Sequence, residues 1–399
     1  MASKDGLSLS DILKKINKEQ SDDNLTDKKP VITIGVEDLT SYGTLSLGSP
    51  GLDFCLYNSF PERKIIEFFG AEGSGKTTLA FLTCASFQKK EMVKHPDNPR
   101  KIIYLDLECR VEPSWALKTG YDMNSSQVQT ICYRPEDQSA EHIFDDIIAM
   151  IKTGEVGMVV IDSLNMLVGQ QVQGESLEKK EMGGIAKPLG DFVKRVTSLL
   201  IKYDCTLIGI NQLRDGLNPY GPAEVTSGGR AWKHGCSVRL KVKKGKFFDA
   251  EGNELSSTAE SPAGYIMEVA VVKTSVCPWD RKLGRTCVSY SQGVDILQDT
   301  IDVATYFNII QNPAPGSFIL TNPDTGEQLK DEEGNPIKIR GKKNIKPYFL
   351  EHLDMWHSMY DKVYEMLSKK TDSNIVSFEK MLGVNVSEIF GIDFMEEEK

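Results

Sequence analysis

The chain has 399 residues, of which 40% are hydrophobic and 26% charged, and its formal net charge is −10. This length allows one sizeable core with smaller appendages, and the composition is typical of a globular protein. No apolar run reaches the roughly 20 residues that a membrane helix needs, so we expect no membrane partner. The acidic balance excludes a global positive field, and any nucleic-acid binding must come from local basic loops.

Cysteine usage predicts the compartment. Eight cysteines are scattered without a C-x-x-C pair, and several lie in apolar, strand-like runs. This distribution is typical of cysteines that serve as small buried hydrophobic residues in a reducing cytosol, whereas a zinc site would need clustered ligands. The N-terminus also lacks the apolar core of a secretory signal. We therefore expect a cytoplasmic protein.

The first residues are polar except for one short helical stripe and a short strand at 31–34. The stripe consists of Leu9, Ile12, Leu13 and Ile16. A helix of this length is marginal alone and must pack on something. The residues leave open whether it packs on its own core or on another subunit.

A phosphate-binding loop follows the strand-like run 65–69. It reads Gly70-Ala71-Glu72-Gly73-Ser74-Gly75-Lys76-Thr77, and Thr78 continues into a helical pattern. This is the pattern G-x-x-x-x-G-K-[ST] in its strand–loop–helix setting. The alternative is a glycine turn before an ordinary helix, which would not require this pattern. Glycines let backbone N–H groups point at the phosphates, and the helix adds its positive end. Lys76 would neutralise the β and γ oxygens, while the Thr77 hydroxyl would complete a Mg²⁺ shell.

Two further strands end in carboxylates. A buried-type strand at 101–106 ends at Leu107-Glu108, and after a helix over about 137–152 the run 157–161 ends at Asp162-Ser163. A carboxylate at a strand end is a weak signal alone. Downstream of a phosphate loop, it predicts that Asp162 holds Mg²⁺ together with Thr77.

Two irregular stretches flank the next strand. The first, 165–187, is glycine-studded and charged, and a helix with apolar residues from Leu189 to Leu200 follows it. A strand at 206–210 ends at Asn211-Gln212, and the second irregular stretch covers 215–229. Strand–helix alternation of this kind predicts an α/β protein with a largely parallel, doubly wound sheet and ligands at the strand C-termini.

The remaining chain predicts strands at 237–243 and 265–273, joined through hairpin-turn chemistry at 249–253. From about residue 300 two turn signals, 324–326 and 333–335, interrupt a β-like segment. One helix should then carry Phe349, Leu350, Leu353, Trp356, Met359, Val363 and Met366. We interpret the acidic C-terminus as a solvated tail, with an autoinhibitory mimic of DNA as the alternative.

The order of these motifs resembles the RecA family of strand-exchange recombinases, including those of large bacteriophages. The resemblance covers about 43–367 and rests on short motifs that are individually weak and strong in combination. They are LSLG at 45–48 with GLD at 51–53, GAEGSGKTT at 70–78, YLDLE at 104–108, VVIDS at 159–163, NQLR at 211–214, TSGGRAWK at 226–233 and VVKTS at 271–275. It implies an oligomerisation arm (1–42), a RecA-like ATPase core (43–300) and a small α+β domain with the tail (301–399).

The resemblance also implies catalytic roles. Glu108 looks like the carboxylate that activates water for attack on the γ-phosphate of ATP, beside Lys76. Gln212 resembles the sensor that feels the γ-phosphate and passes its state to the following loop. Trp115, with Glu112 beside it, falls where the family places an aromatic on the adenine.

Both irregular stretches match the DNA-binding loops of the family. The residues concerned are Lys179, Lys180, Met182 and Gly183, then Lys194 and Arg195 on the next helix, and Arg214, Leu217, Gly228 and Gly229. Cations and glycine N–H groups would neutralise phosphates, while Met182 and Leu217 could wedge between bases without reading sequence. Without the resemblance, ordinary solvated loops would be the favoured interpretation.

Some positions depart from the family. Lys273 keeps the first of two lysines that cross to the ATP of a neighbouring subunit, but Ser275 replaces the second, which leaves Lys233 as another candidate. His234 stands where an aromatic coupling residue is often found. Residues 249–264 look like an added hairpin of unknown purpose.

The motifs together with the resemblance imply an ATP- and Mg²⁺-dependent recombinase in a bacterial cell or phage-infected host. It would form a helical filament on single-stranded DNA, pair it with homologous duplex DNA, and work with single-strand-binding and mediator proteins. One alternative is a RecA-fold regulator without strand exchange, which Ser275 favours and Glu108 and Gln212 oppose. A small-molecule kinase would need a substrate pocket and a lid, and a hexameric helicase would need an N-terminal domain that we do not see.

Overall fold

The chain divides into two compact units, residues 1–43 and 44–399, and all features below lie in the second unit. The computed structural model describes residues 43–58, 60–134, 138–170, 184–215, 224–250, 253–256, 258–322, 325–331 and 333–368. The helix and strand expected before residue 43, and the acidic tail, lie outside the described residues. No helix in these ranges is both long and apolar enough to cross a membrane.

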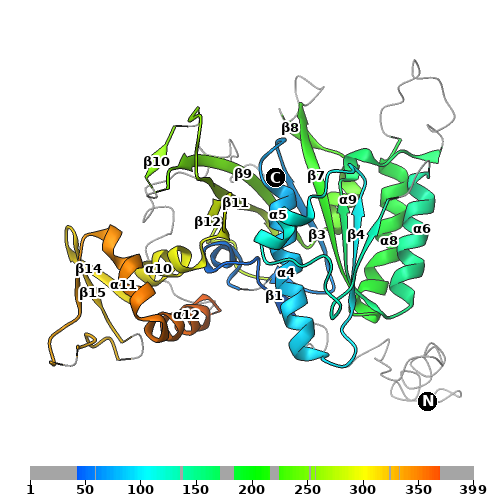
Figure 1. Ribbon diagram of the computed structural model, residues 1–399. Coiled ribbons are helices and arrows are strands. Elements are labelled where there is room, and N and C mark those ends of the chain that lie inside the picture. Colours follow the sequence, from blue (N-terminus) through cyan, green and yellow to red (C-terminus); the bar gives the residue numbers. More distant parts are fainter. Residues whose placement is uncertain are drawn as a thin grey trace, which may run out of the picture. The chain divides into compact units, whose positions relative to one another are not determined.

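An 11-stranded sheet forms the centre of the second unit, in the order β13-β12-β11-β9-β3-β7-β6-β4-β5, with β10 on β9 and β8 on β7 (Figure 1). The strands from β9 to β5 pair in parallel, and those from β9 to β13 are antiparallel. This confirms the predicted largely parallel α/β sheet. Its strands are β3 (Ile65–Gly70), β4 (Lys101–Asp106), β5 (Thr130–Tyr133), β6 (Val156–Asp162), β7 (Thr206–Asp215), β8 (Glu224–Thr226), β9 (Val238–Phe248), β10 (Glu254–Leu255), β11 (Gly264–Thr274), β12 (Leu283–Ser289) and β13 (Gly293–Val294).

Amphipathic helices pack against this sheet and complete its core. In α6 the hydroxyl of Ser139 accepts the N–H of His142 as an N-cap, and Ile143, Phe144 and Ile147 are buried. The ring of Phe144 stacks on Phe192 of α8 with centroids 4.3 Å apart, so α6 and α8 run side by side (Figure 1). The helices and short elements of this part are β1 (Thr44–Leu45), α3 (Pro50–Asp53), η1 (Phe54–Leu56), β2 (Phe60–Pro61), α4 (Lys76–Lys94), α5 (Pro113–Lys118), α6 (Ala140–Lys152), η2 (Leu164–Met166), α8 (Ala186–Lys202) and α9 (Gly229–Gly235).

The strand after α8 is longer than the sequence predicted. It continues beyond Ile210 to Asp215, because β8 pairs with its end and joins Leu213 to Thr226 and Asp215 to Glu224. The two segments that flank residues 216–223 of the second irregular stretch are therefore held in one ladder, and part of that stretch is a strand. Residues 216–223 between them lie outside the described ranges.

The C-terminal elements build a second cluster of apolar side chains. They are α10 (Ile296–Tyr306), the antiparallel strands β14 (Ile310–Ala314), β15 (Ser317–Leu320) and β16 (Lys338–Arg340), η3 (Lys342–Asn344), α11 (Ile345–Glu351) and α12 (Leu353–Leu367). The cluster also includes Phe54 of η1, whose ring meets that of Tyr306 edge-on at 4.7 Å.

The prediction of a single helix near the C-terminus is wrong. His352 has φ −129° and ψ 61°, which separates α11 from α12. Its ring stacks on Tyr348 at 4.2 Å, and its Nδ1 donates to the carbonyl oxygen of Tyr348. The break rotates the apolar face, so Leu350 and Leu353 are exposed instead of packed.

A buried carboxylate at the end of α3 gives unfolding a pH dependence. Asp53 is 1% exposed; its Oδ1 accepts the N–H of Leu47, and its Oδ2 accepts the hydroxyls of Ser46 and Tyr364. Burial raises the pKa of Asp53 to about 6 in spite of these hydrogen bonds. Since its usual value is 3.8, the folded chain binds this proton more tightly than the unfolded chain does.

The stabilisation from this proton is therefore complete below about pH 4 and is lost as the pH rises through about 6. We expect it to amount to about 3 kcal/mol, from a pKa difference of about two units. Urea unfolding of the wild type and of Asp53→Asn between pH 4 and 7 tests this. The wild type should gain stability relative to the variant as the pH falls, and a constant difference would contradict the prediction. Asp97→Asn, at an exposed position, is the control.

Candidate nucleotide-binding and hydrolysis site

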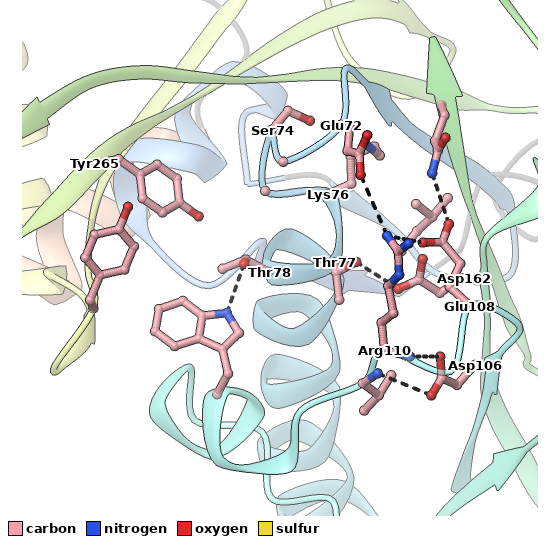
Figure 2. A pocket seen from close by; sticks show the side chains of 17 residues that line it. Glu72, Ser74, Lys76, Thr77, Thr78, Asp106, Glu108, Arg110, Asp162 and Tyr265 are labelled. Carbon is pink, nitrogen blue, oxygen red and sulfur yellow. Dashed lines mark hydrogen bonds and ion pairs between the residues drawn. The ribbon is translucent and has the colours of Figure 1, made fainter. Parts of the chain in front are cut away.

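The carboxyl ends of the central strands meet at one edge of the sheet. The register pairs Gly70 of β3 with Gln212 of β7, and Asp106 of β4 with Asp162 of β6. Parallel strands bring their carboxyl ends to the same edge, so segments distant in the sequence come together there. They line a pocket of about 430 Å³ (Figure 2).

The phosphate loop forms one wall of this pocket. Gly75 has φ 97°, a left-handed conformation that glycine adopts without strain, and it precedes the first residue of α4. Lys76 Nζ donates to the carbonyl oxygens of Gly70 (3.1 Å) and Ala71 (2.6 Å). Burial lowers the pKa of Lys76, against the opposing effect of nearby carboxylates. The hydroxyl of Ser74 is buried without a described partner, as expected of a group that serves a ligand.

Thr77 and Asp162, the two residues predicted to hold Mg²⁺, lie in contact. The Thr77 hydroxyl donates to Asp162 Oδ2 at 2.8 Å, and the Tyr104 hydroxyl donates to the same oxygen at 2.9 Å. Burial raises the pKa of Asp162 to about 6, and these two hydrogen bonds oppose the shift. A hydroxyl and a carboxylate beside a phosphate loop are hard oxygen ligands, so the residues present fit Mg²⁺ that keeps most of its water.

Glu108 and Gln212 are joined directly. Glu108 Oε1 accepts the side-chain N–H of Gln212 at 3.0 Å and the hydroxyl of Ser163 at 2.6 Å. The backbone N–H of Gln212 donates to the side-chain oxygens of Asn165 and Asn211, both at 3.0 Å. Glu108 at the pocket and Gln212, from which β7 continues to its C-terminal end, therefore share one hydrogen-bond network (Figure 2).

A buried network beneath the phosphate loop escaped the sequence reasoning. Asn211 Nδ2 donates to Glu67 Oε1 (2.8 Å) and to the carbonyl oxygen of Ser227 (2.9 Å). Glu67, which is fully buried, also accepts Arg239 Nε. The guanidinium of Arg239 lies over the ring of Phe69 at 4.7 Å. The one available signal was a glutamate inside an apolar strand, which must find a partner when buried.

Aromatic side chains lie at the other end of the pocket. Trp115 Nε1 donates to the Thr78 hydroxyl at 3.1 Å, and Tyr265 and Tyr290 line the pocket with rings 5.9 Å apart (Figure 2). Glu112 is not among the described lining residues; its carboxylate caps α5 by accepting the N–H and hydroxyl of Ser114. Sequence reasoning missed both tyrosines because no motif marks them.

The two candidate lysines lie away from this pocket. Lys273 Nζ donates to the carbonyl oxygens of Lys233 and His234 at 3.0 Å, at the C-terminal end of α9. Burial lowers the pKa of Lys273. Ser275 is exposed and donates to the carbonyl oxygen of Ser237. A role for Lys273 or Lys233 at the ATP of a neighbouring subunit stays a prediction.

Half of the ten candidate DNA contacts fall outside the described ranges. Lys179, Lys180, Met182, Gly183 and Leu217 lie outside them.

The described candidates are partly engaged in ion pairs. On α8, Lys194 pairs with Asp191 at 3.2 Å and Arg195 with Asp145 at 2.7 Å. Arg214 is exposed on β7. Gly228 and Gly229, both with positive φ, open α9. Their contact with DNA stays a prediction.

The fold and the pocket define a nucleotide hydrolase built on a phosphate loop. The family model described as RecA N-terminal domain matches residues 8–295. Protein RecA of Chlorobaculum tepidum is 32% identical over 81% of this chain and 84% of its own. Protein RecA of Chlorobium chlorochromatii is 29% identical (82% and 83% covered), and that of Mycoplasma mobile 26% (88% and 95%).

The chain therefore belongs to the RecA family, which confirms the resemblance that the motifs indicated. It is a recombination and repair protein with DNA-dependent ATPase activity.

Proposed function

We propose that this chain polymerises on single-stranded DNA as a helical filament, binds ATP with Mg²⁺ at the pocket, and pairs the bound strand with homologous duplex DNA. The hydrogen bond between Glu108 and Gln212 is the observation that carries this proposal. It joins the group suited to activate water with the strand that leads into the second candidate DNA loop.

In this proposal the γ-phosphate of ATP competes with Glu108 for the amide of Gln212. When Gln212 donates to the phosphate, Glu108 is free to accept a proton from the attacking water. When the phosphate leaves, Gln212 returns to Glu108. Because β8 holds the far end of the same loop against β7, each exchange at Gln212 acts on both loop ends.

The other pocket residues would hold the nucleotide. The loop from Gly70 to Thr78 would receive the phosphates. Thr77 and Asp162, together with the adjacent Ser163, would hold Mg²⁺, which would neutralise charge on the phosphate oxygens. Trp115 would stack on the base, with the Glu112 cap fixing its helix. Lys273 and Lys233 would serve the nucleotide of an adjacent subunit.

The candidate DNA contacts keep their proposed roles, and the protein would act in the cytoplasm of a bacterial cell or phage-infected host. Single-strand-binding and mediator proteins are proposed as further partners. A regulator without strand exchange is the alternative, and no observation favours it beyond the neutral side chain of Ser275.

ATP hydrolysis with and without single-stranded DNA, at one fixed salt concentration, tests the proposal. We expect strong stimulation by DNA, together with strand exchange only when the duplex is homologous. Hydrolysis indifferent to DNA would contradict the proposal. Stimulated hydrolysis without pairing of homologous duplex would favour the regulator.

A further inference from the structure

The pocket contains more negative than positive side chains. Its described lining has four carboxylates and two cations: Glu72, Asp106, Glu108, Asp162, Lys76 and Arg110. A triphosphate adds further negative charge, and its transfer depends on electrostatic stabilisation. Lys76 is already fixed within the phosphate loop by two carbonyl oxygens. The other cation of this lining is Arg110, which no sequence motif marked.

The backbone of Arg110 is held rigidly beside the phosphate loop. The carboxylate of Asp106 accepts the N–H groups of Arg110 (3.1 Å) and Val111 (3.2 Å), and Arg134 pairs with Asp106 at 2.9 Å. The N–H of Leu107 donates to the carbonyl oxygen of Asp162 at 2.8 Å. These bonds fix the turn after β4, so the position of Arg110 over the pocket does not depend on its own side chain.

The side chain of Arg110 reaches two carboxylates of the pocket, those of Glu108 and Glu72. Its Nη1 lies 3.5 Å from Glu108 Oε2 and 3.7 Å from Glu72 Oε1 (Figure 2). The side chain is 71% exposed, and exposed ion pairs contribute only about 0–1 kcal/mol. Exchanging these carboxylates for phosphate oxygens therefore costs little. The planar guanidinium also matches the geometry of a phosphate better than an ammonium group does.

We propose that Arg110 is a catalytic residue, which contacts the γ-phosphoryl group from the same subunit as Lys76 and Glu108. The inference rests on the proposed hydrolysis of ATP at this pocket. The water oxygen bonds to the γ-phosphorus, its proton passes to Glu108, and the bond to the β–γ bridging oxygen breaks with the electron pair leaving on ADP. Arg110 exchanges no proton in this step and stabilises the charge on the transferred group.

Three variants test this inference by steady-state hydrolysis with saturating single-stranded DNA. Arg110→Gln should lower kcat roughly 100-fold or more, while KM for ATP changes only a few-fold. Arg110→Lys should recover part of kcat, because it restores the charge without the fork. Lys101→Gln removes a half-buried, paired cation from the opposite end of β4 and should behave as the wild type.

Either of two results would overturn the inference. An Arg110→Gln kcat within two-fold of the wild type would show that the charge is not used in the transition state. A raised KM with unchanged kcat would show that Arg110 binds only the ground state. Both results leave the proposed function intact if DNA stimulates hydrolysis by the wild type. A wild type that DNA does not stimulate contradicts the proposed function. In that case, the comparison of kcat between Arg110→Gln and the wild type still tests the role of Arg110. Urea unfolding checks that the variants fold.

Discussion

Replacing Glu108 with glutamine is expected to lower the kcat of ATP hydrolysis by roughly 10²–10⁴-fold, the range typical of a general base. The amide keeps the size of the side chain, and its oxygen can still accept from Ser163 and Gln212 as Glu108 Oε1 does. It cannot accept a proton from water. ATP binding and assembly on single-stranded DNA should therefore persist while turnover stops.

The measurement is hydrolysis at saturating ATP and DNA, beside equilibrium binding of ATP and of single-stranded DNA. Glu155→Gln is the matched control, because Glu155 is an exposed carboxylate paired with Lys101 near the opposite edge of the sheet. A kcat for Glu108→Gln within ten-fold of the control would exclude Glu108 as the base. Loss of ATP binding would instead indicate a structural role.

Replacing Arg239 with methionine is expected to lower the free energy of unfolding by about 3–5 kcal/mol. Glu67 is fully buried, and Arg239, which is 8% exposed, supplies its opposite charge. Removing the cation leaves a buried carboxylate whose remaining side-chain hydrogen bond within the described ranges comes from the amide of Asn211. Asn211 also donates a hydrogen bond to the carbonyl oxygen of Ser227. We therefore expect the stimulation of hydrolysis by DNA to weaken at temperatures where the variant is still folded.

Urea unfolding followed by circular dichroism measures this loss. The double variant Glu67→Gln, Arg239→Met removes the charge while keeping an acceptor for Asn211, and it should recover at least half of the stability. A loss below about 1 kcal/mol for Arg239→Met alone, of the size seen for exposed pairs, would show that the ion pair does not stabilise the fold.

Local patterns carried much of the prediction. The phosphate loop and the carboxylates Glu108 and Asp162 are defined by neighbours within a few residues, and their chemistry depends on strand ends that hydrophobic runs reveal. The parallel sheet that alternation predicted also placed them at one edge, as the register of β3, β4, β6 and β7 shows.

Predictions failed where a distant partner decided the outcome. The extension of β7 to Asp215 depends on pairing with β8, and no periodicity in β7 indicates that partner. The prediction of one helix at His352 failed for a different reason, because apolar spacing does not report a local break in the backbone, where φ is −129° and ψ is 61°. Tertiary pairing overrides local propensity in β7.

The sequence by itself determined the α/β class, the family, the phosphate loop and the carboxylates beside it, because each rests on contiguous residues with one demanding geometry. Only the tertiary structure decided that Gln212 bonds Glu108, that Arg110 faces the same pocket, that Tyr265 and Tyr290 join Trp115, and that Glu67 meets Arg239. Strand order brings these groups together, and strand order follows from packing a whole sheet rather than from any local pattern.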